Sequence, residues 1–238
     1  NLHSGSQATS RRLWDAEEQT ADKITFVIKD AEGQQGYPGN AVMKVTYEVT
    51  EANELSITYH ATADKTTIFN MTNHAYFNLC GKGKKITEHR LHIPADRILD
   101  TTPAFIPTGK RMNVKNTPFD FTSLKPIGTD LYADHEQLLW NKGYNHCYIL
   151  KDEISVEMLE AASLYEPVTG RKMTVMTDLP AVLLYTAGYY ERPDTAVCLE
   201  TQFYPDTPSH SDFPSCLVLP EKAYEHCTLF HFQVQKEE

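Results

Sequence analysis

His74 is the first residue in the sequence whose type and surroundings could support proton-transfer chemistry. It lies in the strand-like run MTNHAYFNL, residues 71–79. Successive side chains of a strand point to opposite faces, so Thr72, Tyr76 and Asn78 share the face of His74. The opposite face is mainly apolar and consists of Met71, Asn73, Ala75, Phe77 and Leu79. A buried apolar face therefore supports a polar one, which either faces water or surrounds a polar ligand.

Glu200 is the second such residue and lies in the run AVCLETQFYP, residues 196–205. Alternation places it on the face of Cys198 and Gln202. A glutamate is rarely buried and costs free energy when buried without partners. The ordinary interpretation is a glutamate that faces solvent, and the more specific one is a general base in a polar groove.

Together, Glu200 and His74 could supply the base and the acid of a proton-transfer reaction. Each such group contributes about 10²–10⁴ in rate. The two residues are 126 positions apart. Spacing alone cannot bring them together, so this hypothesis depends on the fold.

Metal and nucleophilic chemistry have less support in the sequence. His89 and His92 are separated by two residues, and His226 and His231 by four. Both offsets are odd, so neither pair presents both rings on one face of a strand. The sequence also lacks the G-x-S-x-G motif of serine hydrolases. We therefore predict no metal site and no serine nucleophile.

The cysteines predict a reducing environment. They are five in number, lie far apart and form no C-x-x-C pair. Neither a disulfide framework nor a zinc site is indicated. We predict reduced thiols and a cytoplasmic protein.

The elements that must position these residues are mostly strands. Helical periodicity occurs only at residues 130–140, just before Gly143. The segment EPVTGRK, residues 166–172, predicts a hairpin connection. The predicted strand runs are 24–28, 41–49, 54–63, 89–93, 147–150, 171–177, 181–187, 196–204, 215–219 and 227–234. Many strands with few helices favour an all-β sandwich or barrel.

Chain length, charge and composition indicate the number of domains and the kinds of partner. The chain has 238 residues, without a linker or an internal repeat, and we predict a single domain over 1–238. The net charge of −10 argues against a nucleic-acid partner. Spanning a bilayer takes about 20 consecutive apolar residues. The sequence contains no such run, so no membrane partner is predicted.

Several motifs follow one another along nearly the whole chain. The longest are TNHAYFNLCG at 72–81, GRKMTVMTDLPAVLLYTAG at 170–188 and CLETQFYPDTPSHSDFPSCLVLP at 198–220. The shorter ones are NLHSG at 1–5, EGQQGYPGN at 32–40, IPTGK at 106–110, TPFDF at 117–121 and GYNHCYIL at 143–150. In content and order these motifs resemble those of the aldose 1-epimerases, the galactose mutarotases.

This resemblance implies a large antiparallel β-sandwich of the galactose mutarotase type (a supersandwich), with the sugar in a groove on one sheet. It implies an isomerase that interconverts the α and β anomers of free hexoses such as galactose and glucose, without a cofactor. Glu200 would be the general base and His74 the general acid. His3 would be a second active-site histidine that hydrogen-bonds the sugar, and Asn145 would contact sugar hydroxyls.

Three departures from the family pattern bear on sugar binding. Asn145 stands where the family has aspartate, which replaces a charge-assisted hydrogen bond by a neutral one. The loop after His3 reads HSGSQATSRRLW rather than H-G-G-x-x-G-F-D-K-x-x-W. The family's substrate-binding arginine precedes the segment that contains His3. We therefore expect a chain that lacks its N-terminal strands, and possible association with that missing segment.

Two other functions remain open at this stage. One is a non-catalytic sugar-binding or regulatory relative with the same fold. The other is a sugar-phosphate 1-epimerase, which would need a basic pocket. Arg11 and Arg12, close to His3 in the sequence, are the local basic residues.

Overall fold

The computed structural model describes residues 2–81, 83–154 and 156–235. Asn1, the first residue of the NLHSG segment, lies outside them. The chain divides into two compact units. The first combines Asn1–Met71 with Cys216–Leu229, and the second combines Thr72–Ser215 with Phe230–Glu238. The expected single domain over 1–238 stays a prediction.

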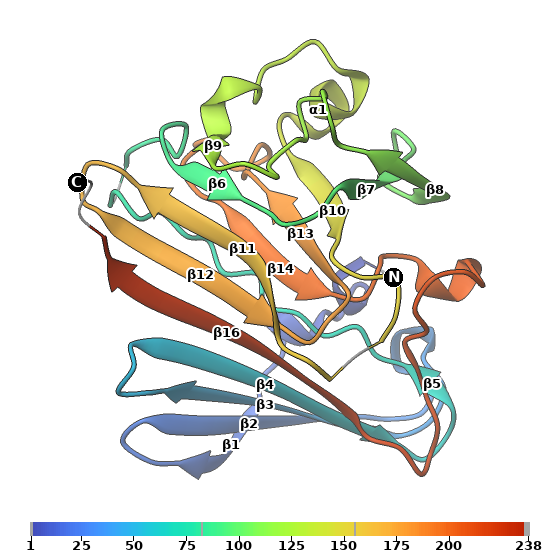
Figure 1. The fold of residues 1–238 in the computed structure, drawn as a ribbon. Coiled ribbons are helices and arrows are strands. Elements are labelled where there is room, and N and C mark those ends of the chain that lie inside the picture. Colours follow the sequence, from blue (N-terminus) through green and yellow to red (C-terminus); the bar gives the residue numbers. More distant parts are fainter. Residues whose placement is uncertain (1, 82, 155, 236–238) are drawn as a thin grey trace. The chain divides into compact units, whose positions relative to one another are not determined.

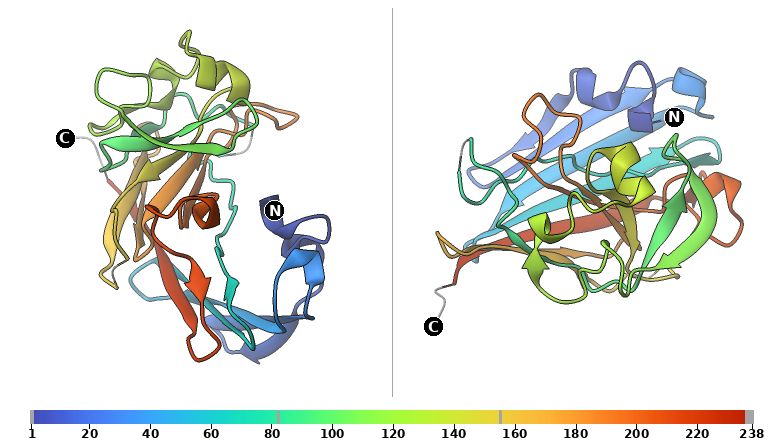
Figure 2. Two further views of the ribbon diagram at one scale, coloured as in Figure 1. Left: turned by 90° about the vertical axis from the view of Figure 1, so that its right-hand side faces the viewer. Right: turned by 90° about the horizontal axis from the view of Figure 1, so that it is seen from above.

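The first unit is built on an antiparallel sheet with the strand order β1-β2-β3-β4, followed by β16. Its N-terminal strands are drawn in blue in Figure 2. The bounds are β1 (Asp15–Gln19), β2 (Lys23–Asp30), β3 (Ala41–Val49), β4 (Glu54–Ala63) and β16 (Tyr224–Val234), of which residues up to Leu229 belong here. A short pair, β5 (Thr67–Ile68) and β15 (Leu217–Val218), completes the unit. The predicted runs 41–49 and 54–63 are confirmed at both ends.

The second unit contains two sheets, whose described neighbouring strands pair antiparallel. One has the order β14-β13-β10-β7-β8, and the other has β12-β11-β6-β9 with the end of β16 beside β12. The first comprises β7 (Arg97–Thr101), β8 (Pro107–Asn113), β10 (Asn145–Ile149), β13 (Ala181–Tyr185) and β14 (Cys198–Gln202). The second comprises β6 (Arg90–His92), β9 (Lys125–Pro126), β11 (Leu159–Glu166) and β12 (Arg171–Thr177).

The core of the second unit lies between these sheets. Figure 1 shows β11 and β12 lying across β13 and β14. On β13, Val182 and Leu184 are fully buried, and on β12 so are Met173 and Val175. Burial of such side chains contributes about 1.5–3 kcal/mol each. Because they alternate along their strands, the intervening residues of β13 point to the other face of its sheet.

The hairpin prediction for residues 166–172 is confirmed. Glu166 pairs with Arg171 as β11 turns into β12. Gly170 has a φ of +72°, and its N–H donates to the carbonyl of Glu166 at 2.9 Å. Glycine adopts this left-handed conformation without the steric cost of a Cβ. The all-β prediction is likewise confirmed.

The predicted helix 130–140 is only half correct. Helix α1 spans Glu136–Asn141, and residues 130–135 are not helical. His135 caps the helix, because its ring accepts a hydrogen bond from the backbone N–H of Gln137 at 3.3 Å. The side chain of Asp130 is held by Lys125 at 2.6 Å, in a turn that precedes the helix. Among the described residues, five 3₁₀ segments accompany the strands, namely Leu2–Ser4, Thr9–Arg11, Gln34–Gly36, Ile127–Thr129 and Thr207–Ser209.

Two further sequence expectations concern the thiols and the membrane. All five cysteines lie in the described part of the chain, and each is a free thiol. None of the helices formed by the described residues is long and apolar enough to cross a bilayer.

Candidate active site

Glu200 occupies the middle of β14, and its side chain is buried. The strand pairs with β13 so that Leu183 lies opposite Glu200 and Tyr185 lies opposite Cys198. Only 6% of Glu200 is exposed. The ordinary interpretation of a solvent-facing glutamate is therefore wrong. Burial is what the more specific interpretation, a general base, requires.

His74 is brought to Glu200 by one backbone bridge. Phe77 and Val197 exchange two antiparallel hydrogen bonds, each 2.9 Å long. Counting three residues back from Phe77 gives 74, and three forward from Val197 gives 200. The bridge thus joins the two segments at a point three residues from each side chain. The imidazole Nε2 lies 3.5 Å from Oε1 of the glutamate.

The predicted strand over residues 71–79 is wrong in one respect. The segment is not part of a regular strand, and the bridge at Phe77 is its one ladder contact among the described residues. The apolar face is formed by Phe77, which packs on Phe230 with ring centroids 5.1 Å apart, and by buried Leu79. Ala75 is exposed instead. Its N–H turns to the side chain of Asn73 at 3.4 Å, a local bond that competes with strand pairing.

Aromatic rings surround the imidazole of His74. Tyr76 stacks on it with centroids 5.0 Å apart and an interplanar angle of 27°. Tyr185 meets it edge-on at 5.9 Å. The pKa of Tyr76 is raised to about 12, mainly by its burial and, to a smaller extent, by the electrostatic effect of the nearby Cys198. The hydroxyl of Tyr76 is therefore protonated at neutral pH. A protonated imidazole would gain about 0.5–1 kcal/mol from an exposed aromatic face.

The electrostatics of Glu200 are dominated by its burial. Loss of hydration raises the pKa of its carboxyl group from 4.5 to about 8. A general base works best when its pKa is near the operating pH. A buried carboxyl group and an imidazole within reach can therefore share one proton and move it at neutral pH.

Asn145 lies on the same face of the sheet. It begins β10 and pairs with Tyr185, which in turn pairs with Cys198 on β14. Directly paired residues point to the same side of a sheet. Asn145 is half-buried there. The structure therefore places it on the face of the sheet that carries Glu200.

His3 belongs to the first unit. It lies in the 3₁₀ segment Leu2–Ser4, is exposed, and has a left-handed φ of +52°. Its expected contact with a sugar stays a prediction.

Sequence reasoning did not assign a role to Tyr185 or Cys198. The type and spacing of Tyr185 gave no signal, because only the β13–β14 register brings it to His74. Cys198 could have been noticed, since alternation already placed it beside Glu200. Tyr76 was likewise on the face of His74 in the predicted alternation.

A group of metal-binding donors also emerges at this place. His74, Cys198 and Glu200 each offer one ligand atom, and the three atoms lie within 4.8 Å of one another. Histidine pairs at strand spacing do not reveal this set, because it mixes three residue types from two segments.

Comparison with known proteins identifies the family. The model of the aldose 1-epimerase family matches residues 1–231. Over 243 residues the chain is 32% identical to the aldose 1-epimerase of Escherichia coli (strain K12), covering 97% of this chain and 70% of that protein. Over 246 residues it is 34% identical to the galactose mutarotase of Mus musculus, covering 98% and 69%.

Solved structures of similar fold come from the same family. An aldose epimerase homologue from C. elegans has a TM-score of 0.86 and 26% identity, covering 98% of this chain and 72% of that one. The galactose 1-epimerase of Lactobacillus acidophilus NCFM has a TM-score of 0.85 and 27% identity, covering 98% and 70%. The predicted β-sandwich of the galactose mutarotase type is thereby confirmed. The chain belongs to the aldose 1-epimerase family of isomerases.

Proposed function

We propose that Glu200 is the general base and His74 the general acid with which this aldose 1-epimerase interconverts the α and β anomers of free hexoses. One observation carries the assignment. His74 Nε2 lies 3.5 Å from a Glu200 carboxylate oxygen, and the side chain of that glutamate is only 8% exposed. An acid and a base are thus held together on one face of one sheet.

The reaction needs only proton movements around a hemiacetal. Glu200 takes the proton of the anomeric hydroxyl while protonated His74 donates one to the ring oxygen, and the bond from the ring oxygen to the anomeric carbon breaks. The free aldehyde rotates about the bond to its neighbouring carbon. Reclosure with the roles reversed forms the other anomer, returns both protons and leaves the enzyme unchanged.

The proton count suits this cycle. The pair must carry one proton in total, because the base has to accept while the acid donates. Burial raises the pKa of Glu200 to about 8. The neighbouring carboxylate favours the imidazolium form of His74. The singly protonated pair is the form that can both accept and donate a proton.

Sugar recognition is proposed for Asn145 and His3. Asn145 is half-buried on the face of the sheet that bears Glu200, where its side chain could hydrogen-bond a hydroxyl. An amide binds a hydroxyl without the charge assistance of the family's aspartate. We therefore expect weaker binding of galactose or glucose rather than loss of the chemistry.

The sugar-phosphate alternative has less support. A phosphate site at Arg11 and Arg12 would need free guanidinium groups. Arg12 forms an ion pair with Asp30 and also donates to the carbonyl of Lys29 at 2.9 Å. The guanidinium group of Arg12 is thus already engaged within its own unit.

A cytoplasmic location is part of the proposal. Its support is the set of five free thiols, which suits a reducing compartment.

The direct test is polarimetry of freshly dissolved α-D-galactose and α-D-glucose at low temperature in weak buffer. The parent protein should accelerate the change in optical rotation. The Glu200→Gln variant, which keeps the shape of the side chain and removes the base, should not. If folded parent protein gives no acceleration above the buffer rate, a binding-only relative becomes the better conclusion.

A further inference from the structure

Three chemically different metal-binding side chains meet at the acid–base pair. Cys198 and Glu200 are two residues apart on β14, so they share one face of the strand. His74 lies in the segment that the Phe77–Val197 bridge joins to the residues just before β14. The three donor atoms lie within 4.8 Å of one another. Two segments that are distant in the sequence thus supply the donors.

The spacing is close to that of a zinc centre. Tetrahedral zinc with its usual bond lengths of 2.0–2.3 Å holds its donor atoms about 3.3–3.8 Å apart. The distance from His74 Nε2 to Glu200 Oε1 is already 3.5 Å. The widest separation, within 4.8 Å, closes with a side-chain movement of about 1 Å.

The donor set also selects the type of ion. One thiol, one imidazole and one carboxylate suit zinc and similar ions, whereas calcium and magnesium prefer oxygen ligands alone. Cys198 and Glu200 are buried, while 32% of the His74 side chain is exposed. The exposed side leaves an entry path and an open fourth position. A divalent ion would also compensate the buried carboxylate, whose burial otherwise disfavours its charge.

We propose that His74, Cys198 and Glu200 form a binding site for Zn²⁺ that inhibits the enzyme. The Zn–S bond forms as the thiol proton of Cys198 leaves to the buffer, and a water molecule takes the fourth position. The ion occupies the lone pairs with which His74 and Glu200 move protons, so metal and sugar exclude each other. The inhibitory part rests on the proposed function, whereas the binding part does not.

Binding is tested first without sugar. Parent protein is titrated with Cd²⁺ while the thiolate-to-metal charge-transfer band is recorded in the ultraviolet, and Zn²⁺ is then added to displace it. Cys147→Ser is the matched control, because Cys147 is a buried thiol on the same sheet, where β10 and β14 both flank β13. Parent and Cys147→Ser should give the band, and Cys198→Ser should not. A band that survives in Cys198→Ser, or is absent from the parent, overturns the site.

Affinity gives a second, independent readout. Loss of supporting groups around a metal costs about 10–100-fold in affinity, so loss of a direct ligand should cost at least about 100-fold. Zn²⁺ affinity measured by competition with a chromophoric chelator should fall by that factor in Cys198→Ser and in His74→Phe. The phenylalanine retains a ring to stack on Tyr76, so this variant tests the site even if Cys198→Ser does not fold. Parent-like affinity in folded His74→Phe contradicts the assignment.

Inhibition is tested last. The ratio of mutarotation rates with and without Zn²⁺ should fall below one for the parent and return to one for Cys198→Ser. A parent that binds Zn²⁺ yet keeps its full rate overturns the inhibitory role. A parent without any mutarotation refutes the proposed function instead, and the cadmium band still decides the binding.

Discussion

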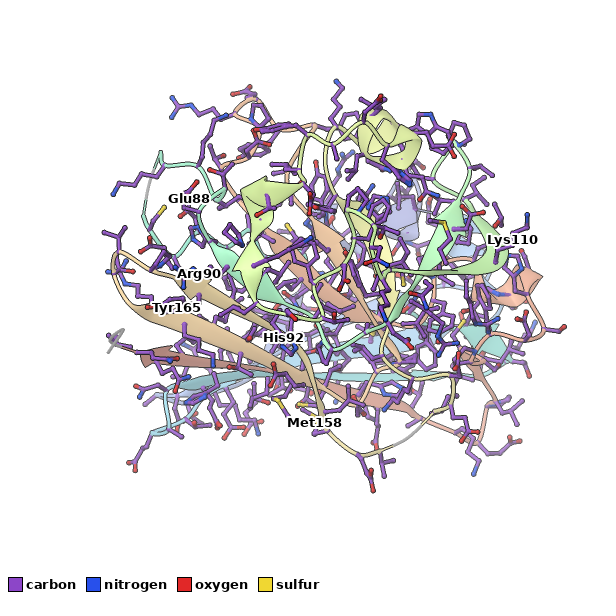
Figure 3. All side chains as sticks on the ribbon, turned by 45° about the horizontal axis from the view of Figure 1, so that its top comes forward. Glu88, Arg90, His92, Lys110, Met158 and Tyr165 are labelled. Carbon is purple, nitrogen blue, oxygen red and sulfur yellow. The ribbon has the colours of Figure 1, made fainter. Side chains whose placement is uncertain are left out.

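Two histidine–glutamate pairs in the second unit resemble each other in distance and differ in surroundings. His74 and Glu200 are 3.5 Å apart, and the glutamate side chain is 8% exposed. His92, on β6, and Glu160, on β11, are 3.2 Å apart, and that glutamate is 41% exposed. Figure 3 labels His92. The second pair is the closer of the two, yet it lies where water screens both groups.

The difference indicates that burial, rather than distance, sets the two pairs apart. An exposed ion pair contributes about 0–1 kcal/mol, because water competes for both charges. Burial costs a carboxylate its hydration, and this raises the pKa of Glu200 to about 8. Variants of both pairs test whether burial makes the proposed acid–base pair functional and leaves the exposed pair without a role.

The largest effect is expected from removing either member of the buried pair. His74→Gln and Glu200→Gln should each lower kcat/KM for galactose by roughly 10²–10⁴. The double variant should lose little more than the worse single variant, because the residues act as a unit. Polarimetry of all three checks this. His92→Gln and Glu160→Gln are the matched controls, and a comparable loss in either would remove the distinction between the pairs.

The second largest effect is expected in the dependence of stability and of the mutarotation rate on pH. The pKa of Glu200 is raised to about 8 in the folded protein, so its contribution to stability is fully present below its unfolded value near 4.5. That contribution is lost as the pH rises through about 8. Catalysis should fall over the same upper range, by about tenfold per pH unit, as the shared proton is lost. A rate profile from pH 5 to about 10 tests this, and a profile flat through pH 9 would contradict the raised pKa.

Asn145→Asp introduces a carboxylate at a position that is less buried than Glu200. We expect KM for galactose to fall by roughly fivefold, because a charge-assisted hydrogen bond is about 1 kcal/mol stronger than a neutral one. Steady-state polarimetry with galactose and glucose separates KM from kcat. An unchanged KM for both sugars would mean that Asn145 does not contact the substrate.

The smallest expected effect concerns Tyr76. Tyr76→Leu removes the ring stacked at 5.0 Å on His74 and should lower kcat by about two- to fivefold, from about 0.5–1 kcal/mol of lost cation–π stabilisation. Tyr76→Phe retains the ring and should keep most of the rate. Equal losses in the two variants would point to the hydroxyl group instead.

Much of the fold could be predicted where strands alternate in polarity. The runs 41–49, 54–63 and 171–177 coincide with β3, β4 and β12. β1 was missed because its residues, DAEEQ, are all exposed and, apart from Ala16, polar. β8, with the sequence PTGKRMN, likewise has little apolar alternation. Backbone pairing with neighbours forms these strands, and a local sequence pattern does not show such pairing.

The residues proposed for the site were named from the sequence, but their environment was not. The family resemblance pointed to Glu200 and His74, and alternation put Cys198 and Tyr76 on the corresponding faces. The burial of Glu200 could not be predicted, because exposure depends on what covers the strand. The ring of Tyr185 could not be predicted either, since it reaches His74 only through the register of β13 with β14.

The Phe77–Val197 bridge has a consequence for how this enzyme tolerates insertions and deletions. His74 and Glu200 lie equal numbers of residues from the bridge on their two segments, and their side chains meet at 3.5 Å. One residue inserted between 74 and 77 would lengthen the path from the bridge to the histidine and move its imidazole away from Glu200. A second insertion between 197 and 200 would restore the count, although the pair would then lie one residue further from the bridge. We therefore expect an insertion or deletion in residues 74–77 to be accompanied by an equal one in residues 197–200, even where the types of the intervening residues vary.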